Sequence, residues 1–307
     1  MKANSQGRVY GLLFLTFFIW GSVYVAGKMI SDAVPAALLA CLRCITAMVP
    51  LSILARKHLH TKIRREDWKY FLLVGGLGYF TTIQLVQLGI ALTGASMASL
   101  INALTPVAVT ILAAFILKEA ITPVKCLCLV LALAGTVVIT SGSSTQSQFV
   151  GSVAVLLSVI SWGAASVYMR RLTARYPAIL VTTFGMALSL VFHIPVGIVT
   201  AATQEVTIGP KVIAVLLYLG FVGSGVAQFT WTRSLAELPA STCSLFYPLQ
   251  AVFSALLGML LLKERLTSNF FLGLLLISAD VALNTWEARR LNRSAEKNNE
   301  ELTGAER

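Results

Sequence analysis

Long apolar runs alternate with short polar breaks along almost the whole chain. Each run holds about 20 residues, the length that an α-helix needs to cross a hydrocarbon core of about 30 Å. The breaks, such as Ser141–Gln148, are too short to join separate soluble domains. The pattern predicts an all-α polytopic membrane protein with ten transmembrane helices, at Val9–Met29, Pro35–Ala55, Tyr70–Thr93, Ala95–Leu117, Val124–Thr140, Gly151–Tyr168, Ala178–Ala201, Val212–Leu235, Ala240–Leu262 and Asn269–Ala288.

Part of this pattern occurs twice. Residues Ala95 to Thr122 align without a gap with Ala240 to Thr267 at an offset of 145, and both copies end in Leu-Lys-Glu-x-x-Thr. Two apolar helices share some leucines by chance, but this ending and the unbroken register are hard to obtain by accident. We therefore predict two repeats, residues 1–145 and 146–288, followed by a charged cytoplasmic tail at 289–307.

Each repeat contains five of the predicted helices. Because five is odd, the second copy would enter the membrane upside down relative to the first. Such an inverted repeat is the plan of many secondary transporters. Two further pairs of segments match at or near the same offset: Ile19-Trp20-Gly21-Ser22 with Ser161-Trp162-Gly163-Ala164, and Gly75 and Gly78 with Gly220 and Gly223.

The composition agrees with a membrane protein. Hydrophobic residues make up 57% of the chain and charged residues 12%, and the mean hydropathy is +0.80, whereas a soluble domain carries about 25% charged residues. Of the 24 Lys and Arg residues, 19 would lie on the inner side, four on the outer side and Arg43 within the membrane. The positive-inside rule then predicts that both termini are cytoplasmic. It also explains the net charge of +11 without a nucleic-acid partner.

Several of these residues together resemble the drug/metabolite transporter superfamily, in its EamA-type branch. They are Trp20-Gly21-Ser22, Arg43, and Asn102 with Pro106 leading to the first Leu-Lys-Glu. The resemblance implies ten helices in two EamA repeats, a central cavity lined mainly by helices 1, 3, 4, 6, 8 and 9, and export or exchange of small metabolites. The second repeat departs from the first in two places, because Pro248 lies one turn from the position of Pro106 and Asp280 replaces Gly135.

Polar and aromatic residues recur at helical spacing on the same six predicted helices. Such side chains are costly inside a bilayer and therefore informative. They would either line a substrate cavity with aromatic walls and amide or hydroxyl donors, or form interhelical hydrogen bonds worth about 0.6 kcal/mol each. For the set as a whole we favour the cavity, and we expect it to contain Trp20, Tyr24, Tyr79, Gln84, Gln87, Ser99, Asn102, Pro106, Trp162, Gln228, Trp231, Ser244, Tyr247 and Gln250.

Four more residues are expected to matter at membrane depth. Arg43 would bind a substrate carboxylate or, as we favour, form a structural pair with helix-end carbonyls or Asp280. Asp280 would be a proton site or, as we favour, a neutral hydrogen-bonded acid. Pro106 and Pro248 each remove a backbone hydrogen bond, which predicts a kink that gates, a carbonyl that binds, or a kink that serves packing alone.

Two glutamates and one histidine complete the candidates. Glu119 and Glu264 end their helices at opposite membrane faces, and each is expected to tie its loop to the N-terminus of a neighbouring helix. His193, in the seventh predicted helix, is expected to be a packing residue rather than a proton relay.

Other function classes lack the residues that they need. An intramembrane enzyme would require paired carboxylates or a nucleophile with a base at membrane depth, and a channel would want rings of like groups. The five cysteines show no metal-ligand spacing and there is no nucleotide-binding motif, so neither a cofactor nor ATP is expected. The sequence favours a secondary transporter in a bacterial inner membrane, a monomer or weak homodimer, that exports amino acids or similar neutral or zwitterionic solutes.

Overall fold

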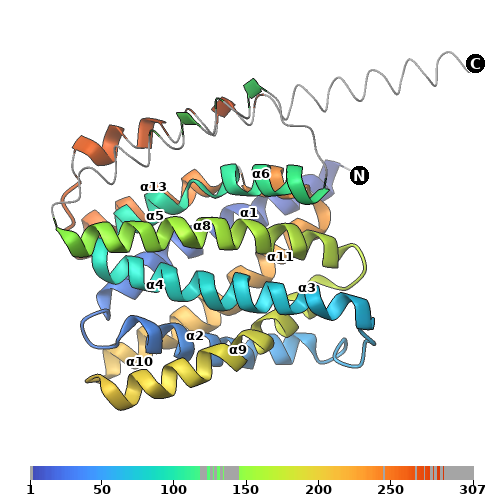
Figure 1. Ribbon diagram of the computed structural model, residues 1–307, viewed down its shortest axis with the longest axis horizontal. Coiled ribbons are helices and arrows are strands. Elements are labelled where there is room, and N and C mark those ends of the chain that lie inside the picture. Colours follow the sequence, from blue (N-terminus) through green and yellow to red (C-terminus); the bar gives the residue numbers. More distant parts are fainter. Residues whose placement is uncertain are drawn as a thin grey trace, which may run out of the picture.

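The computed structural model describes most of the chain as a bundle of helices (Figure 1). The described residues are 3–117, 145–244 and 246–266, with the shorter pieces 123–124, 127, 130–131, 134, 268–272, 274–276, 279, 282–283 and 286. Most of the expected fifth and tenth helices falls outside them, and so do Glu119, Asp280 and the tail at 289–307.

Seven of the described helical stretches are long and apolar enough to cross a membrane, and Tyr247–Leu262 is a shorter apolar helix. All eight overlap ranges that the hydropathy pattern predicts, which confirms those helices. The largest difference in length is at the sixth expected helix, which runs from Gln146 to Thr173 and so extends five residues further at each end than Gly151–Tyr168.

The first repeat contains α1 (Ala3–Met29), α2 (Ala36–Ala55), the short 3-10 helix η1 (Arg65–Asp67), α3 (Trp68–Leu73), η2 (Val74–Thr81), α4 (Thr82–Thr93), α5 (Ala95–Asn102) and α6 (Thr105–Leu117). The second contains α8 (Gln146–Thr173), α9 (Ala178–Thr203), α10 (Pro210–Leu217), η3 (Tyr218–Val226), α11 (Ala227–Glu237), α12 (Ala240–Ser244), α13 (Tyr247–Leu257) and η4 (Gly258–Leu262). Prolines begin several of these helices, because a missing N–H costs nothing in the first turn. Gly94, with φ of +94°, makes the tight link between α4 and α5.

The third and eighth membrane helices each contain a π-helical segment at equivalent positions. Thr82 donates its backbone N–H to the carbonyl of Leu77, and Ala227 donates to Val222, so both bonds span five residues. The two donors, Thr82 and Ala227, are 145 residues apart, and so are the two acceptors, Leu77 and Val222. The Leu77 carbonyl also accepts a hydrogen bond from Ser161 of α8 at 3.1 Å. The repeat seen in the sequence therefore extends to an unusual backbone conformation.

The fourth and ninth membrane helices are both interrupted next to their prolines. α5 ends at Asn102 and α6 begins at Thr105, while α12 ends at Ser244 and α13 begins at Tyr247. In both copies the proline is the second residue after the interruption, where its missing N–H is tolerated. The position of the proline therefore determines where each helix is interrupted. Because Pro248 lies one turn earlier than Pro106 in the aligned repeats, the interruption also lies one turn earlier in the second copy.

The remaining membrane helices pack as two three-helix units. The first unit consists of α1, α2 and α10–η3–α11, and η3 packs on both α1 and α2. The second consists of α3–η2–α4, α8 and α9, and η2 packs on both α8 and α9. α2 and α9 pack on each other and join the two units, as their neighbouring places in Figure 1 illustrate.

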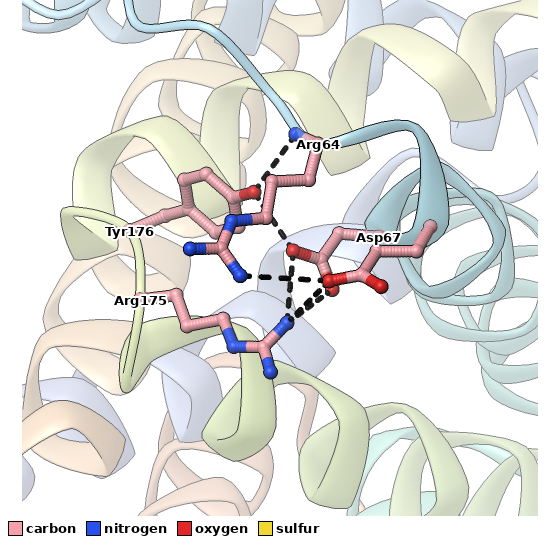
Figure 2. Close-up of polar contacts among 5 residues, drawn as sticks. Arg64, Asp67, Arg175 and Tyr176 are labelled. Carbon is pink, nitrogen blue, oxygen red and sulfur yellow. Dashed lines mark hydrogen bonds and ion pairs between the residues drawn. The ribbon is translucent and has the colours of Figure 1, made fainter.

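One end of the bundle carries a buried carboxylate. We call it the basic end, formed by the loops 56–67 and 174–177 and seen at the right of Figure 1. Asp67, only 2% exposed, accepts from Arg175 Nη1 at 3.1 Å and from the Tyr176 hydroxyl at 2.8 Å (Figure 2). The hydrogen bond and charge of Asp67 raise the pKa of Arg175, and burial raises the pKa of Tyr176. These contacts join the loop 56–67, which leads into α3, to the loop 174–177, which connects α8 and α9.

At the opposite end Glu264 joins the two repeats. Its carboxylate accepts the backbone N–H groups of Ala95 at 2.8 Å and Ser96 at 3.1 Å, and the Ser96 hydroxyl as well. A carboxylate is favourable there because the N-terminus of a helix is partially positive. The expected tie between Glu264 and a neighbouring helix N-terminus is thus confirmed, whereas that of Glu119 lies outside the described residues.

Candidate functional site

A cavity lies between the two units, where helices from both repeats meet. It contains about 450 Å³ of space not filled by protein atoms, with the open solvent at its mouth included. Its wall comes from α1, α2, α4, α5, α8, α11 and α13. The lining residues are Trp20, Val23, Tyr24, Arg43, Thr82, Ile83, Val86, Asn102, Trp162, Gln228, Tyr247 and Gln250.

An aromatic cluster closes the cavity towards the basic end. We define it as Phe17, Trp20, Trp162, Trp231 and Tyr247, whose rings come from α1, α8, α11 and α13. Their centroids lie between 4.7 Å (Phe17 to Tyr247) and 6.4 Å (Trp162 to Trp231) apart. All five rings are buried, with at most 7% exposed. Phe17 and Trp231 lie nearer the basic end than the cavity-lining Trp20 and Gln228 on the same helices.

Arg43 reaches the cavity from α2 and is 4% exposed. Its Nε donates to Ser224 Oγ at 2.8 Å and its Nη1 to Gln87 Oε1 at 3.3 Å. Both partners are neutral. The ion pairs found among the described residues all lie near the basic end, around Arg175 and Arg233. Arg43 is therefore a buried cation whose partners in the described chain are a hydroxyl and an amide.

Several buried polar atoms around the cavity have no hydrogen-bond partner among the described residues. They are the hydroxyls of Tyr79, Ser166 and Tyr247, Gln228 Oε1, Trp231 Nε1 and Gln250 Nε2. Most buried polar groups in native proteins are satisfied, so such a concentration calls for an explanation. Three of these side chains line the cavity itself. Their free donors and acceptors are what a bound solute or ordered water would satisfy.

Half of the expected site residues line this cavity. Trp20, Tyr24, Asn102, Trp162, Gln228, Tyr247 and Gln250 do so, together with Arg43. Four others lie directly behind the wall. Tyr79 packs on Trp162, with 6.0 Å between the ring centroids, and Trp231 belongs to the aromatic cluster. Gln87 accepts a hydrogen bond from Arg43, and Pro106 is the second residue of α6, which follows Asn102 along the chain.

Three expected residues lie in helix contacts instead. Ser99 donates to the carbonyl of Ser96 at 2.9 Å, and Ser244 is fully buried in α12. Gln84 donates from Nε2 to His193 Nδ1 at 3.1 Å and to the Ala37 carbonyl at 3.4 Å. With Nδ1 accepting, His193 Nε2 carries the proton and donates to the Tyr79 carbonyl at 3.3 Å. These bonds fit a neutral packing histidine, as the sequence predicts.

The sequence prediction missed four cavity residues: Val23, Thr82, Ile83 and Val86. They are apolar or carry only a hydroxyl, so nothing distinguishes them from lipid-facing or packing positions. The only signal available was spacing, because Thr82 and Val86 lie three and seven residues after Tyr79.

A second hollow lies at the basic end, between Lys69, Tyr70, Arg171 and the Asp67–Arg175 pair. Lys69 and Arg171 both lie over the Tyr70 ring, at 5.1 Å and 4.4 Å from its centroid. The two carboxylates that line this hollow, Glu66 and Asp67, are both paired with Arg175. Among the described residues, no group of three or more His, Cys, Asp or Glu side chains is placed to hold a metal ion.

The comparison with protein families decides the class of this bundle. The sequence model of the EamA-like transporter family matches residues 8–141 and 149–286. The chain belongs to this family. This EamA-like transporter is therefore an integral membrane protein of a small-molecule transporter family.

Individual relatives agree with the family. The EamA-like transporter is 26% identical to the uncharacterized transporter YoaV of Bacillus subtilis, over 91% of this chain and 97% of that protein. It is 27% identical to a probable terminal-alkyne amino-acid exporter of Streptantibioticus cattleyicolor, over 76% of this chain and 79% of that one. A solved crystal structure matches with a TM-score of 0.69 and 21% identity, over 92% of this chain and 98% of that chain, which shows a shared fold.

Proposed function

We propose that this EamA-like transporter is a secondary transporter that exports small organic metabolites, such as amino acids or similar neutral or zwitterionic solutes. The observation that carries the proposal is the cavity between the two units, with aromatic walls, unsatisfied amide and hydroxyl groups and one cation. The relative named as a probable amino-acid exporter supports the same solute class.

Alternating access is the proposed mechanism. The two repeats would form an inverted pair of five helices each, with Asn102 and Tyr247 at equivalent positions facing one cavity. The matched π-helical segments and the matched unit packing support this relation. Rocking of one unit against the other would open the cavity to each side in turn. The state described here is closed towards the basic end by the aromatic cluster.

The proposed orientation places the basic end in the cytoplasm of a bacterium, with both termini on that side and the chain in the inner membrane. The positive-inside rule supports it, because the loops at 56–67 and 174–177 are rich in Lys and Arg. A monomer or weak homodimer suffices, since the cavity described lies within one chain.

Cysteine labelling in proteoliposomes tests this function. A bulky thiol reagent attached to Asn102→Cys or Tyr247→Cys should block exchange of a radiolabelled amino-acid mixture, because both side chains line the cavity. Substrate should protect both positions from labelling. The matched control is Ile53→Cys on α2, which is 60% exposed on the lipid-facing surface. Unchanged exchange after full labelling at Asn102 and Tyr247 would contradict the proposal.

A further inference from the structure

Arg43 combines deep burial with a lack of a charged partner in the described chain. Leaving an ionised group unpaired in an apolar environment costs several kcal/mol or more, so buried charges are paired or functional. Ser224 and Gln87 orient the guanidinium but bring no negative charge. Its position in the cavity wall means that a bound solute reaches it directly.

Among the described residues, no side chain that lines the cavity carries a negative charge. Its lining has one cation, no Asp or Glu, and otherwise aromatic, aliphatic, amide and hydroxyl side chains. Asp280, the candidate partner in the tenth predicted helix, lies outside the described residues. The electrostatic match for this site is therefore an anion.

The geometry leaves part of the guanidinium free to bind one. An arginine has five N–H donors in a planar fork, and the two hydrogen bonds above use Nε and Nη1. Nη2 lies beside Gly223, where a Cβ atom would come within 3.7 Å of it and collide with Val23. The Val23 side chain occupies that position, so the glycine lets η3 pack closely against α1 beside the guanidinium. Nη2 makes neither of the two hydrogen bonds above, and its N–H groups can donate to a carboxylate.

We propose that Arg43 binds the carboxylate of the transported solute and makes that carboxylate the required feature of the substrate. This rests on the proposed transport function and refines its solute class. The aromatic and aliphatic wall takes an apolar body. Because none of the described cavity-lining side chains is acidic, an ammonium group on the solute gains no ionic contact from them. The substrates are then monocarboxylates, for which an α-amino group is optional.

A matched ligand series on the purified wild-type protein tests this directly. Binding is followed by the fluorescence of Trp20 and Trp162, which line the cavity, and by the melting temperature. The probes are leucine, leucine methyl ester, 4-methylpentanoate and isopentylamine, and the corresponding phenylalanine set. Both carboxylates of each set should bind at least about tenfold more tightly than the ester and the amine. Esters or amines that bind as tightly as the acids, or a series without any preference for carboxylates, would overturn the proposal.

Variants of Arg43 give a second, independent measurement. Arg43→Gln retains a donor but loses the charge, so the preference for acid over ester should disappear. Arg43→Lys should keep a weaker preference, because an ammonium attracts a carboxylate without the planar fork. The matched control is Arg170→Gln, which removes a cation that binds the Leu235 carbonyl outside the cavity, and it should leave the preference unchanged.

The same series in proteoliposomes separates this inference from the function on which it rests. Exchange of solutes without any carboxylate preference would leave the transport function standing and overturn the role of Arg43. Arg43-dependent binding of carboxylates without any exchange would do the reverse.

Discussion

The two three-helix units share a backbone plan and differ in the polar group that they hold beside their π-helical segments. In the first unit η3 packs on α2, and Ser224 of η3 anchors Arg43 in the cavity wall. In the second unit η2 packs on α9, and the Tyr79 carbonyl of η2 accepts from a neutral His193. Repetition thus accounts for the scaffold, whereas the charge that would recognise a solute belongs to one unit alone.

The loops of the two units differ in the same way. In the second unit Asp67 gathers Arg175 and Tyr176 into a buried network at the basic end. The equivalent loops of the first unit are 30–35 and 204–209, at the opposite end of the bundle. They meet through a hydrogen bond from the backbone N–H of Thr207 to the carbonyl of Ala33 at 2.9 Å. The second unit is therefore tied more firmly by its loops, and the unit that carries Arg43 is tied less firmly.

The largest effects are expected where each π-helical segment touches its neighbour. A Cβ at Gly75 would lie 2.9 Å from the backbone oxygen of Gly185, and one at Gly220 would collide with the Thr46 side chain. Either Gly→Ala change should lower the free energy of unfolding by about 1–3 kcal/mol through overpacking. Thr46→Ala should restore part of the stability of Gly220→Ala, because it removes the colliding Oγ1 but leaves the Cβ of residue 46 within 2.6 Å.

No such rescue is available for Gly75→Ala, since its neighbour is backbone. Melting temperatures of the purified single and double variants check this. Equal melting temperatures for Gly220→Ala with and without Thr46→Ala would show that the two interfaces are not packed as described.

An intermediate effect is expected at the loop junctions. Asp67→Asn removes the charge that holds Arg175, and it should cost about 1–2 kcal/mol, a modest value because the Arg175 side chain is 46% exposed. Thr207→Pro removes one backbone N–H donor and should cost less, about 1 kcal/mol or below. Thermal unfolding of both variants measures the difference. A larger loss for Thr207→Pro would reverse the assignment of the firmer unit.

The smallest effect on selectivity is expected at His193. His193→Gln should lower the free energy of unfolding slightly. The glutamine amide can still bond to Gln84 and to the Tyr79 carbonyl, but it does not fill the place of the ring. The preference for carboxylates over esters should stay as in the wild type, since the ring does not line the cavity. A changed preference, measured with the leucine series, would mean that the second unit also reads the solute.

The sequence predicted the helices and part of the cavity for identifiable reasons. Trp20, Asn102 and Tyr247 were recognisable because polar and aromatic groups are conspicuous in apolar helices. Ser244 is placed on the same face as Tyr247 by assuming an unbroken helix, but the interruption before Pro248 separates the two. Ser99 lies one turn before Asn102 in α5, and its hydroxyl is bonded within the helix to the Ser96 carbonyl. Ile83 and Val86 had no signal, because an aliphatic residue in a membrane helix looks the same towards solute, lipid or protein.

The π-helical segments have a consequence for how this cavity changes between related chains. A π-helical turn contains about one residue more than an α-helical turn, and each residue of an α-helix advances its rotational phase by about 100°. Deleting one residue within Val74–Thr81 would let the segment relax to a regular helix. The following stretch, with Thr82, Ile83 and Val86, would keep its orientation towards the solute, because an α-helical turn with one residue fewer covers the same rotation. A deletion in an α-helical stretch would instead rotate everything after it by about 100°. η2 and η3 are therefore places where the chain can lose one residue without turning the cavity wall.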